Sequence, residues 1–237
     1  MDGYAVTGQF HDPLAAQAHA EVDARIAQAI APLGPLGGPV LDIGAGTGLT
    51  TALIARTLTE AEIFAIEPDA TMRAALMTRI WHDPDLRRRV SILPMDALSA
   101  PLPDRIAGAV LSASLVHFSP AERAQLWAAL AGRLVPGGRI VAELQAQQAI
   151  DIPPAAMATA QVGRITYSGT AAAQALPGNR QRWTMTYRSE YAGRVMREEQ
   201  ASYVCWCVDQ DSISREARAA GLQSAPCGEL MILSRAT

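Results

Sequence analysis

The stretch Val40-Leu41-Asp42-Ile43-Gly44-Ala45-Gly46-Thr47-Gly48 carries the strongest signal in this chain. Its aliphatic residues predict a buried strand, and the alternating glycines predict a tight turn that a ligand can approach closely. Apolar residues at helical spacing over residues 50–58 then predict a helix. Backbone N–H groups and a helix N-terminus therefore meet at the glycine turn, which is typical of a site for a nucleotide-like ligand.

The spacing of these glycines indicates which ligand is bound. A dinucleotide fingerprint has glycines at its first, third and sixth places, and the sixth place here is Leu49. Asp42 stands two residues before the first glycine, where an acid is awkward beside a pyrophosphate but suits a cationic ligand. A methionine-derived cofactor with an ammonium and a sulfonium fits this pattern. An NAD-dependent oxidoreductase is the alternative, and Leu49 disfavours it.

Further short apolar runs follow the glycine turn. Residues 62–68 predict a second strand that ends at Glu67, an acid placed to bind both hydroxyls of a ribose. Further strands are predicted over 90–97, 106–112 and 137–143, with helices over 71–81 and 121–134. Strands that alternate with helices predict a parallel sheet covered by helices on both faces, hence an α/β fold.

Taken together, these motifs resemble those of class I S-adenosylmethionine-dependent methyltransferases. The resemblance rests on five segments in order, namely residues 40–48, 65–68, 95–97, 110–118 and 134–141. It implies a Rossmann-like, doubly wound, mostly parallel sheet of seven strands, with an N-terminal helix and an inserted β-hairpin cap after the fifth strand. It also implies S-adenosylmethionine as the cofactor.

The same resemblance implies a set of cofactor-binding residues: Asp42, Gly44, Ala45, Gly46, Glu67, Pro68, Met72, Asp96, Ala97 and Ser112. The glycine turn would approach the methionine and ribose, and Asp42 would face the amino group directly or through water. Glu67 would bind the ribose, whereas Asp96 and Ala97 would flank the adenine. The alternative for Asp42 and Asp96 is a capping or turn carboxylate, and for Met72 a core residue.

Two histidines are the candidate catalytic residues. His117 follows the fourth strand, where open α/β sheets place their ligands, and a neutral imidazole suits a general base. Its alternative is local packing at a helix start, because Ser119-Pro120 resembles an N-cap with proline at the first helical position. His11 is the second candidate, since the N-terminal segment of the resembled fold often folds over the cofactor. A merely packed terminus is its alternative.

Changes in pattern divide the chain into four segments. Residues 1–37 are an N-terminal helical segment, and residues 38–145 are the cofactor-binding core. Residues 146–207 are an inserted cap, in which 182–207 predict a β-hairpin. Residues 208–237 supply a helix and strands that complete the core sheet. The cap either covers the methyl acceptor or serves as a sheet extension or homodimer contact, and both interpretations stay open.

Composition limits the partners. The net charge of −3 over 237 residues gives no basic field for nucleic acid, and Ser112–Leu115 lacks the signature of base-amine methyltransferases, so the acceptor is expected to be a small molecule. No run resembles a membrane span or signal peptide, which predicts a cytoplasmic protein.

Cysteine usage adds no chemistry. Cys205 and Cys207 share one face of a predicted strand, and Cys227 stands apart. No Cys or His pair lies nearby, so we expect buried structural residues and no metal site. A third function stays open beside the methyltransferase and the oxidoreductase, namely a non-catalytic regulatory module that binds S-adenosylmethionine.

Overall fold

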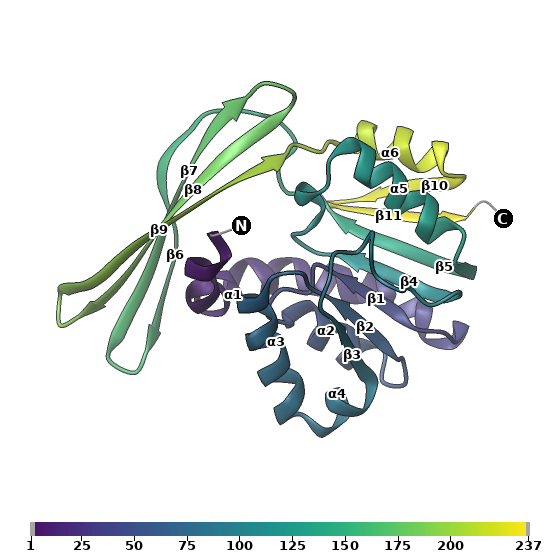
Figure 1. The fold of residues 1–237 in the computed structure, drawn as a ribbon, viewed down its shortest axis with the longest axis horizontal. Coiled ribbons are helices and arrows are strands. Elements are labelled where there is room, and N and C mark those ends of the chain that lie inside the picture. The colour runs from purple at the N-terminus through teal and green to yellow at the C-terminus, as the bar shows by residue number, and fades with distance from the viewer. Residues whose placement is uncertain (1–2, 236–237) are drawn as a thin grey trace. The chain divides into compact units, whose positions relative to one another are not determined.

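The computed structural model describes residues 3–235. They form two compact units (Figure 1). The sheet unit consists of the chain up to Glu21 together with Gln148–Cys207, and the core unit consists of Val22–Gln147 together with the chain from Val208 onward. Within the described residues, no helix is long and apolar enough to span a bilayer.

The core unit is built on a seven-stranded sheet in the order β10-β11-β5-β4-β1-β2-β3. Its strands are β1 (Val40–Ile43), β2 (Ile63–Ile66), β3 (Val90–Leu93), β4 (Ile106–Leu111), β5 (Leu134–Glu143), β10 (Leu222–Cys227) and β11 (Leu230–Arg235). The first five are parallel, and β11 runs antiparallel to both β5 and β10. The predicted mostly parallel sheet of seven strands is therefore confirmed. The strand order reverses at β1, so ligands are expected beyond the carboxyl ends of β1 and β4.

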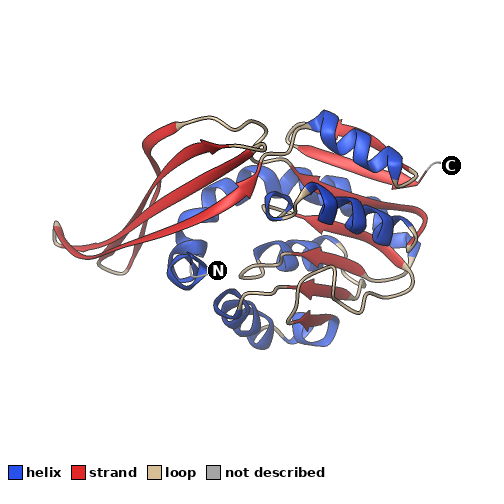
Figure 2. Ribbon diagram, turned by 45° about the horizontal axis from the view of Figure 1, so that its top comes forward, coloured by secondary structure: helices blue, strands red, loops and turns tan. Residues whose placement is uncertain are grey.

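Helices cover both faces of this sheet. They are α1 (Gly3–Ile30), α2 (Leu49–Thr57), α3 (Ala70–His82), α4 (Pro84–Arg89), α5 (Pro120–Ala131) and α6 (Gln210–Ala219), with short 3₁₀ turns η1 (Ala31–Leu36) and η2 (Leu115–His117). The end of α1, together with η1, α2, α3 and α4, packs around Val40, Ile63 and Ala65. Successive strand residues point to opposite faces, so Leu41 and Ile43 point to the other face, where α5 and α6 lie side by side (Figures 1 and 2).

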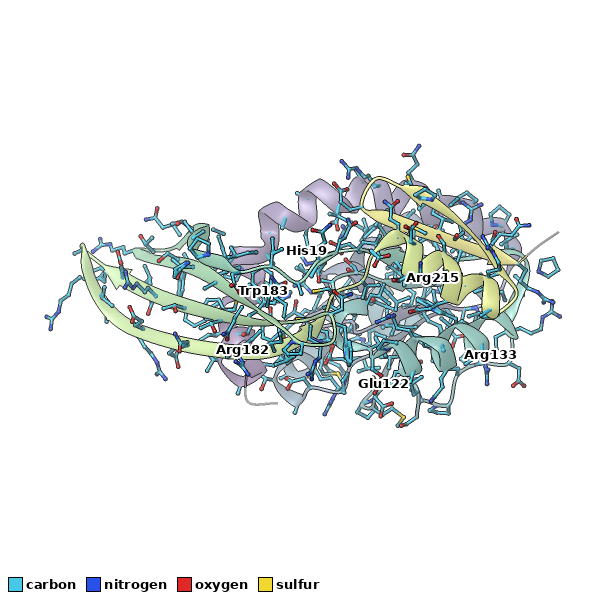
Figure 3. All side chains as sticks on the ribbon, turned by 90° about the horizontal axis from the view of Figure 1, so that it is seen from above. His19, Glu122, Arg133, Arg182, Trp183 and Arg215 are labelled. Carbon is cyan, nitrogen blue, oxygen red and sulfur yellow. The ribbon has the colours of Figure 1, made fainter. Side chains whose placement is uncertain are left out.

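Local signals set the start of α5, the helix that follows the candidate His117. Ser119 is its N-cap, Pro120 occupies its first turn, and Ser119 and Glu122 exchange the two bonds of a capping box. The N-cap predicted at Ser119-Pro120 is therefore confirmed. Glu122 lies in the first turn, as the macrodipole favours, and Arg133, two residues beyond the end of the helix, donates from Nη1 to the carbonyl of Ala129 at 2.9 Å (Figure 3).

The sheet unit contains four antiparallel strands, β6 (Ile152–Val162), β7 (Ile165–Leu176), β8 (Arg180–Tyr191) and β9 (Arg194–Trp206). The predicted hairpin is confirmed as β8 and β9, which turn at Ala192-Gly193 with positive φ at both residues. Strands β6 and β7 were not predicted. Their alanine-rich sequences, and Pro153 and Pro154 within β6, have low β propensity. Pairing therefore decides their structure, since β7 pairs with β8 and β6 pairs with β7.

An aromatic cluster holds the first part of α1 on this sheet. Phe10 is buried, and its ring stacks on that of Tyr187 with centroids 4.7 Å apart. Leu14 packs in the same cluster as Met185. Trp183 and Arg182 are consecutive residues of β8, so their side chains point to opposite faces of the sheet; Trp183 packs on the cluster and Arg182 is exposed (Figure 3).

Candidate active site

The glycine turn joins the end of β1 to α2. The amides of Gly44 and Ala45 both donate to the carbonyl of Ile66, at 2.9 and 3.0 Å, which fixes the turn to the end of β2. Gly44 has a φ of +73°, and a Cβ there would lie 2.5 Å from Cβ of Ser114. Gly46 also has a positive φ, yet a Cβ there would meet nothing within 4 Å. The turn is thus closed toward Ser114 and open above Gly46, which leaves room for a ligand to approach the backbone.

Glu67 lies at the end of β2 and is only 6 % exposed. Its carboxylate accepts from the amide of Gly46 and from the amide of Asp69, each at 2.8 Å. Burial raises the pKa of Glu67, while these two bonds oppose the rise. The structure therefore brings Glu67 against the glycine turn, and its role toward a ribose stays a prediction.

Asp42 is 1 % exposed and points toward α2. Thr51 Oγ1 donates to its carboxylate at 2.5 Å. Burial raises the pKa of Asp42 to about 7, the Thr51 bond lowers it, and the nearby Glu67 raises it. Asp42 is thus a buried acid that titrates near neutral pH. Thr51 was not among the predicted residues, although it lies in the first turn of the predicted helix.

Asp96 and Ala97, the residues predicted to flank the adenine, differ in their exposure to solvent. Asp96 is exposed and accepts from the amides of Leu98 and Ser99 at 3.0 Å each and from Ser99 Oγ at 2.7 Å. The Ser99 hydroxyl bond is the largest cause that lowers the pKa of Asp96. Asp96 thus acts as a turn carboxylate in this structure. Ala97 is buried beside it, and the adenine role of both residues stays a prediction.

Pro68 and Met72 bracket the start of α3. Pro68 is exposed after Glu67, and Asp69 caps the helix by accepting from the amides of Thr71 and Met72. Met72 is buried at 4 % exposure, as a core residue would be. Its contact with a cofactor therefore stays a prediction.

The end of β4 is fixed by a residue that the predicted site does not include. Glu143, the last residue of β5, accepts from Ser112 Oγ at 2.8 Å and from the amide of Ala113 at 2.9 Å with the same carboxylate oxygen. Ser112 is buried at the predicted place after β4. The only sequence signal for Glu143 is that it is an acid at the end of a strand, as Glu67 is.

His117 lies in η2, two residues before the N-cap of α5. Leu111–Phe118 is largely buried, and His117 is its one exposed residue. Solvent reaches the residue, while desolvation by the surrounding protein lowers the pKa of its imidazole. The ring is therefore neutral at physiological pH, as a general base must be.

His11 lies within α1, in the sheet unit. Its Nδ1 is 3.2 Å from the Asp12 carboxylate, and its ring centroid is 6.0 Å from that of His19. The core unit supplies all the other predicted site residues. The catalytic role of His11 stays a prediction.

The three cysteines, Cys205, Cys207 and Cys227, form no disulfide in the described residues. Cys205 and Cys207 are buried, whereas Cys227 is exposed, contrary to the expectation of burial. Over the described range 3–235, no group of three or more His, Cys, Asp or Glu side chains is arranged to hold a metal ion.

Comparison with known proteins agrees with this architecture. Residues 40–138 match the family model described as a methyltransferase domain. A comparison with curated proteins found no match. The match covers less than half of the chain. Together with the fold, it indicates a class I, Rossmann-like methyltransferase domain over residues 40–138, with S-adenosylmethionine as its cofactor.

Several solved structures share the fold over nearly the whole chain. The DesVI protein of Streptomyces venezuelae is 19 % identical with a TM-score of 0.76, covering 99 % of this chain and 98 % of its own. An amino pentose methyltransferase of Micromonospora echinaspora, solved with S-adenosylmethionine bound, is 21 % identical with a TM-score of 0.73, covering 92 % and 91 %. A sugar N-methyltransferase of Streptoalloteichus is 18 % identical with a TM-score of 0.71, covering 91 % and 87 %.

Proposed function

We propose that this protein transfers a methyl group from S-adenosylmethionine to a nitrogen atom of a small molecule, with His117 as the general base. The observation that carries the proposal is the placement of His117, an exposed residue with a neutral imidazole in an otherwise largely buried segment after β4. Nitrogen is favoured over oxygen because similar structures include an amino pentose methyltransferase and a sugar N-methyltransferase. An amino group on a sugar is the first acceptor to test.

The cofactor residues proposed are those of the glycine turn and the acids around it. The open space above Gly46 accommodates a ligand against the backbone, and Asp42 and Glu67 supply negative charge for a cationic cofactor with a ribose. Ser112, Pro68, Met72, Asp96 and Ala97 complete the proposed set at the neighbouring strand and helix ends. S-adenosylmethionine supplies a methyl group on a sulfonium, which is an electrophile.

The chain itself has to place the acceptor and remove its proton. An alkylammonium must lose a proton before its nitrogen has a lone pair to attack, and a hydroxyl must lose one as its oxygen attacks. His117 receives that proton on a ring nitrogen, and its lowered pKa keeps the nitrogen available at physiological pH. His11 is the second candidate for the same task.

Replacing His117 by Ala tests the proposal most directly. We expect kcat to fall about 10²- to 10⁴-fold, the usual contribution of a general base, while the affinity for S-adenosylmethionine stays unchanged. The measurement is transfer of a radiolabelled methyl group to amino sugars beside matching sugars with a hydroxyl in place of the amine. His82→Ala is the control, because His82 is an exposed histidine at the end of α3.

Binding measurements separate the competing functions. Calorimetry with S-adenosylmethionine and with NAD should give binding of the first alone, and tight NAD binding without the methyl donor would overturn the proposal. Binding of S-adenosylmethionine without turnover of any acceptor would favour a regulatory module. Unchanged turnover of His117→Ala across the pH range would remove His117 as the base, and His11→Ala would then be assayed in the same way.

A further inference from the structure

The segment that carries His117 is fastened to the strands on both sides of it. On the β5 side, one oxygen of Glu143 accepts from Ser112 Oγ and from the amide of Ala113. On the β1 side, Ser114 Oγ donates to the carbonyl of Ile43 at 2.6 Å. Three consecutive residues after β4 are therefore fixed by the two strands that flank it.

The middle residue of this segment has an unusual backbone. Ala113 has a φ of +53°, a conformation that L-residues disfavour. Ala192, which shares this feature, lies in a two-residue hairpin turn, where positive φ is expected. Ala113 lies in no hairpin, so its conformation must be held by its neighbours. The charge-assisted bond from its amide to Glu143 is the contact that holds it.

A hydrogen bond and burial also fix the backbone from Ser114 to His117. The amide of His117 donates to the carbonyl of Ser114 at 3.1 Å, and Leu115 and Val116 between them are buried. On the far side, Arg123 Nη1 donates to the carbonyl of Phe118 at 2.8 Å. The direction in which the His117 ring points therefore depends on how the chain leaves β4 at Ser112 and Ala113.

We propose that Glu143 is a positioning residue for His117, acting through its two bonds to Ser112 and Ala113. This inference rests on the proposed function, because it assigns Glu143 to the base of that reaction. Glu143 has no proton-transfer step of its own. It keeps Ala113 in its disfavoured conformation, and η2 then presents the imidazole in a single orientation.

Three variants separate the hydrogen bonds from the charge. Glu143→Ala removes both bonds and the charge. Glu143→Gln removes the charge but keeps an amide oxygen that can accept from both donors. Ser112→Ala removes one bond and keeps the other, and it serves as the test if Glu143→Ala does not fold. Glu62→Gln is the matched control, since Glu62 is an exposed acid just before β2.

The readouts are amide hydrogen exchange at Ala113 and His117 and the NMR signal of the His117 ring, assigned by its loss in His117→Gln. In Glu143→Ala we expect exchange at least about tenfold faster, which corresponds to losing about 1.4 kcal/mol of local protection, and a broadened or split ring signal. Glu143→Gln and Glu62→Gln should stay within about threefold of the wild type with a single ring signal, and Ser112→Ala should be intermediate.

The outcomes distinguish this inference from the proposed function. Unchanged exchange and ring signal in Glu143→Ala would overturn the positioning role. Identical behaviour of the Gln and Ala variants would overturn the action through the two hydrogen bonds, since charge alone would then be responsible. If His117→Ala keeps full activity, the proposed base is wrong, yet exchange and the ring signal still report whether Glu143 orients this segment. The affinity for S-adenosylmethionine should change less than about twofold in the two Glu143 variants, because Ser114 still ties the segment to the glycine turn.

Discussion

In the core unit, hydrogen bonds fix acidic side chains at the ends of strands. In the sheet unit, contacts between neighbouring strands run along their whole length. In the core, strands end in acids whose carboxylates accept from nearby backbone amides, as Glu67 and Glu143 do. In the sheet unit, long strands pair through cross-strand contacts such as the exposed ion pair of Arg188 with Glu198.

The two units also differ in how completely their apolar side chains are buried. Strands β1 and β4 are buried at every residue, while apolar residues near the hairpin ends of the sheet unit, such as Met196 at 64 % exposure, are open to solvent. A polar group fixed by two or three neighbours keeps one position, and this is what a catalytic site requires. The comparison favours the core unit for the proposed chemistry, while His11 of the sheet unit stays the second candidate base.

The largest expected effect comes from removing the aromatic centre of the sheet unit. Phe10→Ala should cost about 3 to 5 kcal/mol, because the ring is buried and stacked on Tyr187. Hydrogen exchange should rise in β7 and β8, while calorimetry should give an unchanged affinity for S-adenosylmethionine. Leu126→Ala, which opens a cavity in the core, should instead raise exchange within residues 22–147. A loss of cofactor affinity in the folded Phe10→Ala protein would show that the two units are not independent.

Two glycine substitutions, one in each unit, test the same difference between the core unit and the sheet unit. Gly44→Ala should cost about 3 kcal/mol, because it combines a positive φ with a Cβ placed 2.5 Å from Cβ of Ser114. Gly193→Ala should cost only about 1 kcal/mol, because its φ is also positive but its surroundings are open. Denaturant unfolding measures both costs. Gly44→Ala should also lower the affinity for S-adenosylmethionine at least about tenfold, and equal affinities for the two variants would contradict the placement of the cofactor at the glycine turn.

These differences explain what the sequence could predict. The glycine turn and Glu67 were predictable because short buried strands with glycines or acids at their ends give a local signal. The bond between Thr51 and Asp42 and the bonds of Glu143 could not be predicted, because they depend on helix orientation and on the pairing of β4 with β5. Tertiary pairing, not local sequence, brings those atoms together.

Elements were missed for two separate reasons. Helix α4 had a usable signal, since Asp83 caps it and Pro84 is its first residue, but the segment is only six residues long. Strands β6 and β7 had almost no signal, because alanine and proline disfavour isolated strands. Their structure comes from pairing with the neighbouring strands, β6 with β7 and β7 with β8, rather than from their own sequence.

The buried Asp42 of the core should make the stability of the protein depend on pH. Its pKa is raised from 3.8 to about 7, so between those values the folded state keeps a proton that the unfolded state has released. The contribution of Asp42 to stability is therefore fully present below about pH 4 and is lost as the pH rises through about 7. Unfolding free energies measured from pH 4 to pH 8 should fall with a slope that Asp42→Asn removes.

Cofactor binding should depend on pH in the opposite direction. A cationic ligand favours the carboxylate form of Asp42, so binding releases a proton, and affinity should rise by up to about tenfold per pH unit until about pH 7. Asp42→Asn keeps an oxygen for the Thr51 bond and should bind with little pH dependence. If the slope persists in that variant, the titrating group is Glu67, whose pKa burial also raises, and the ammonium contact predicted for Asp42 would lose its support.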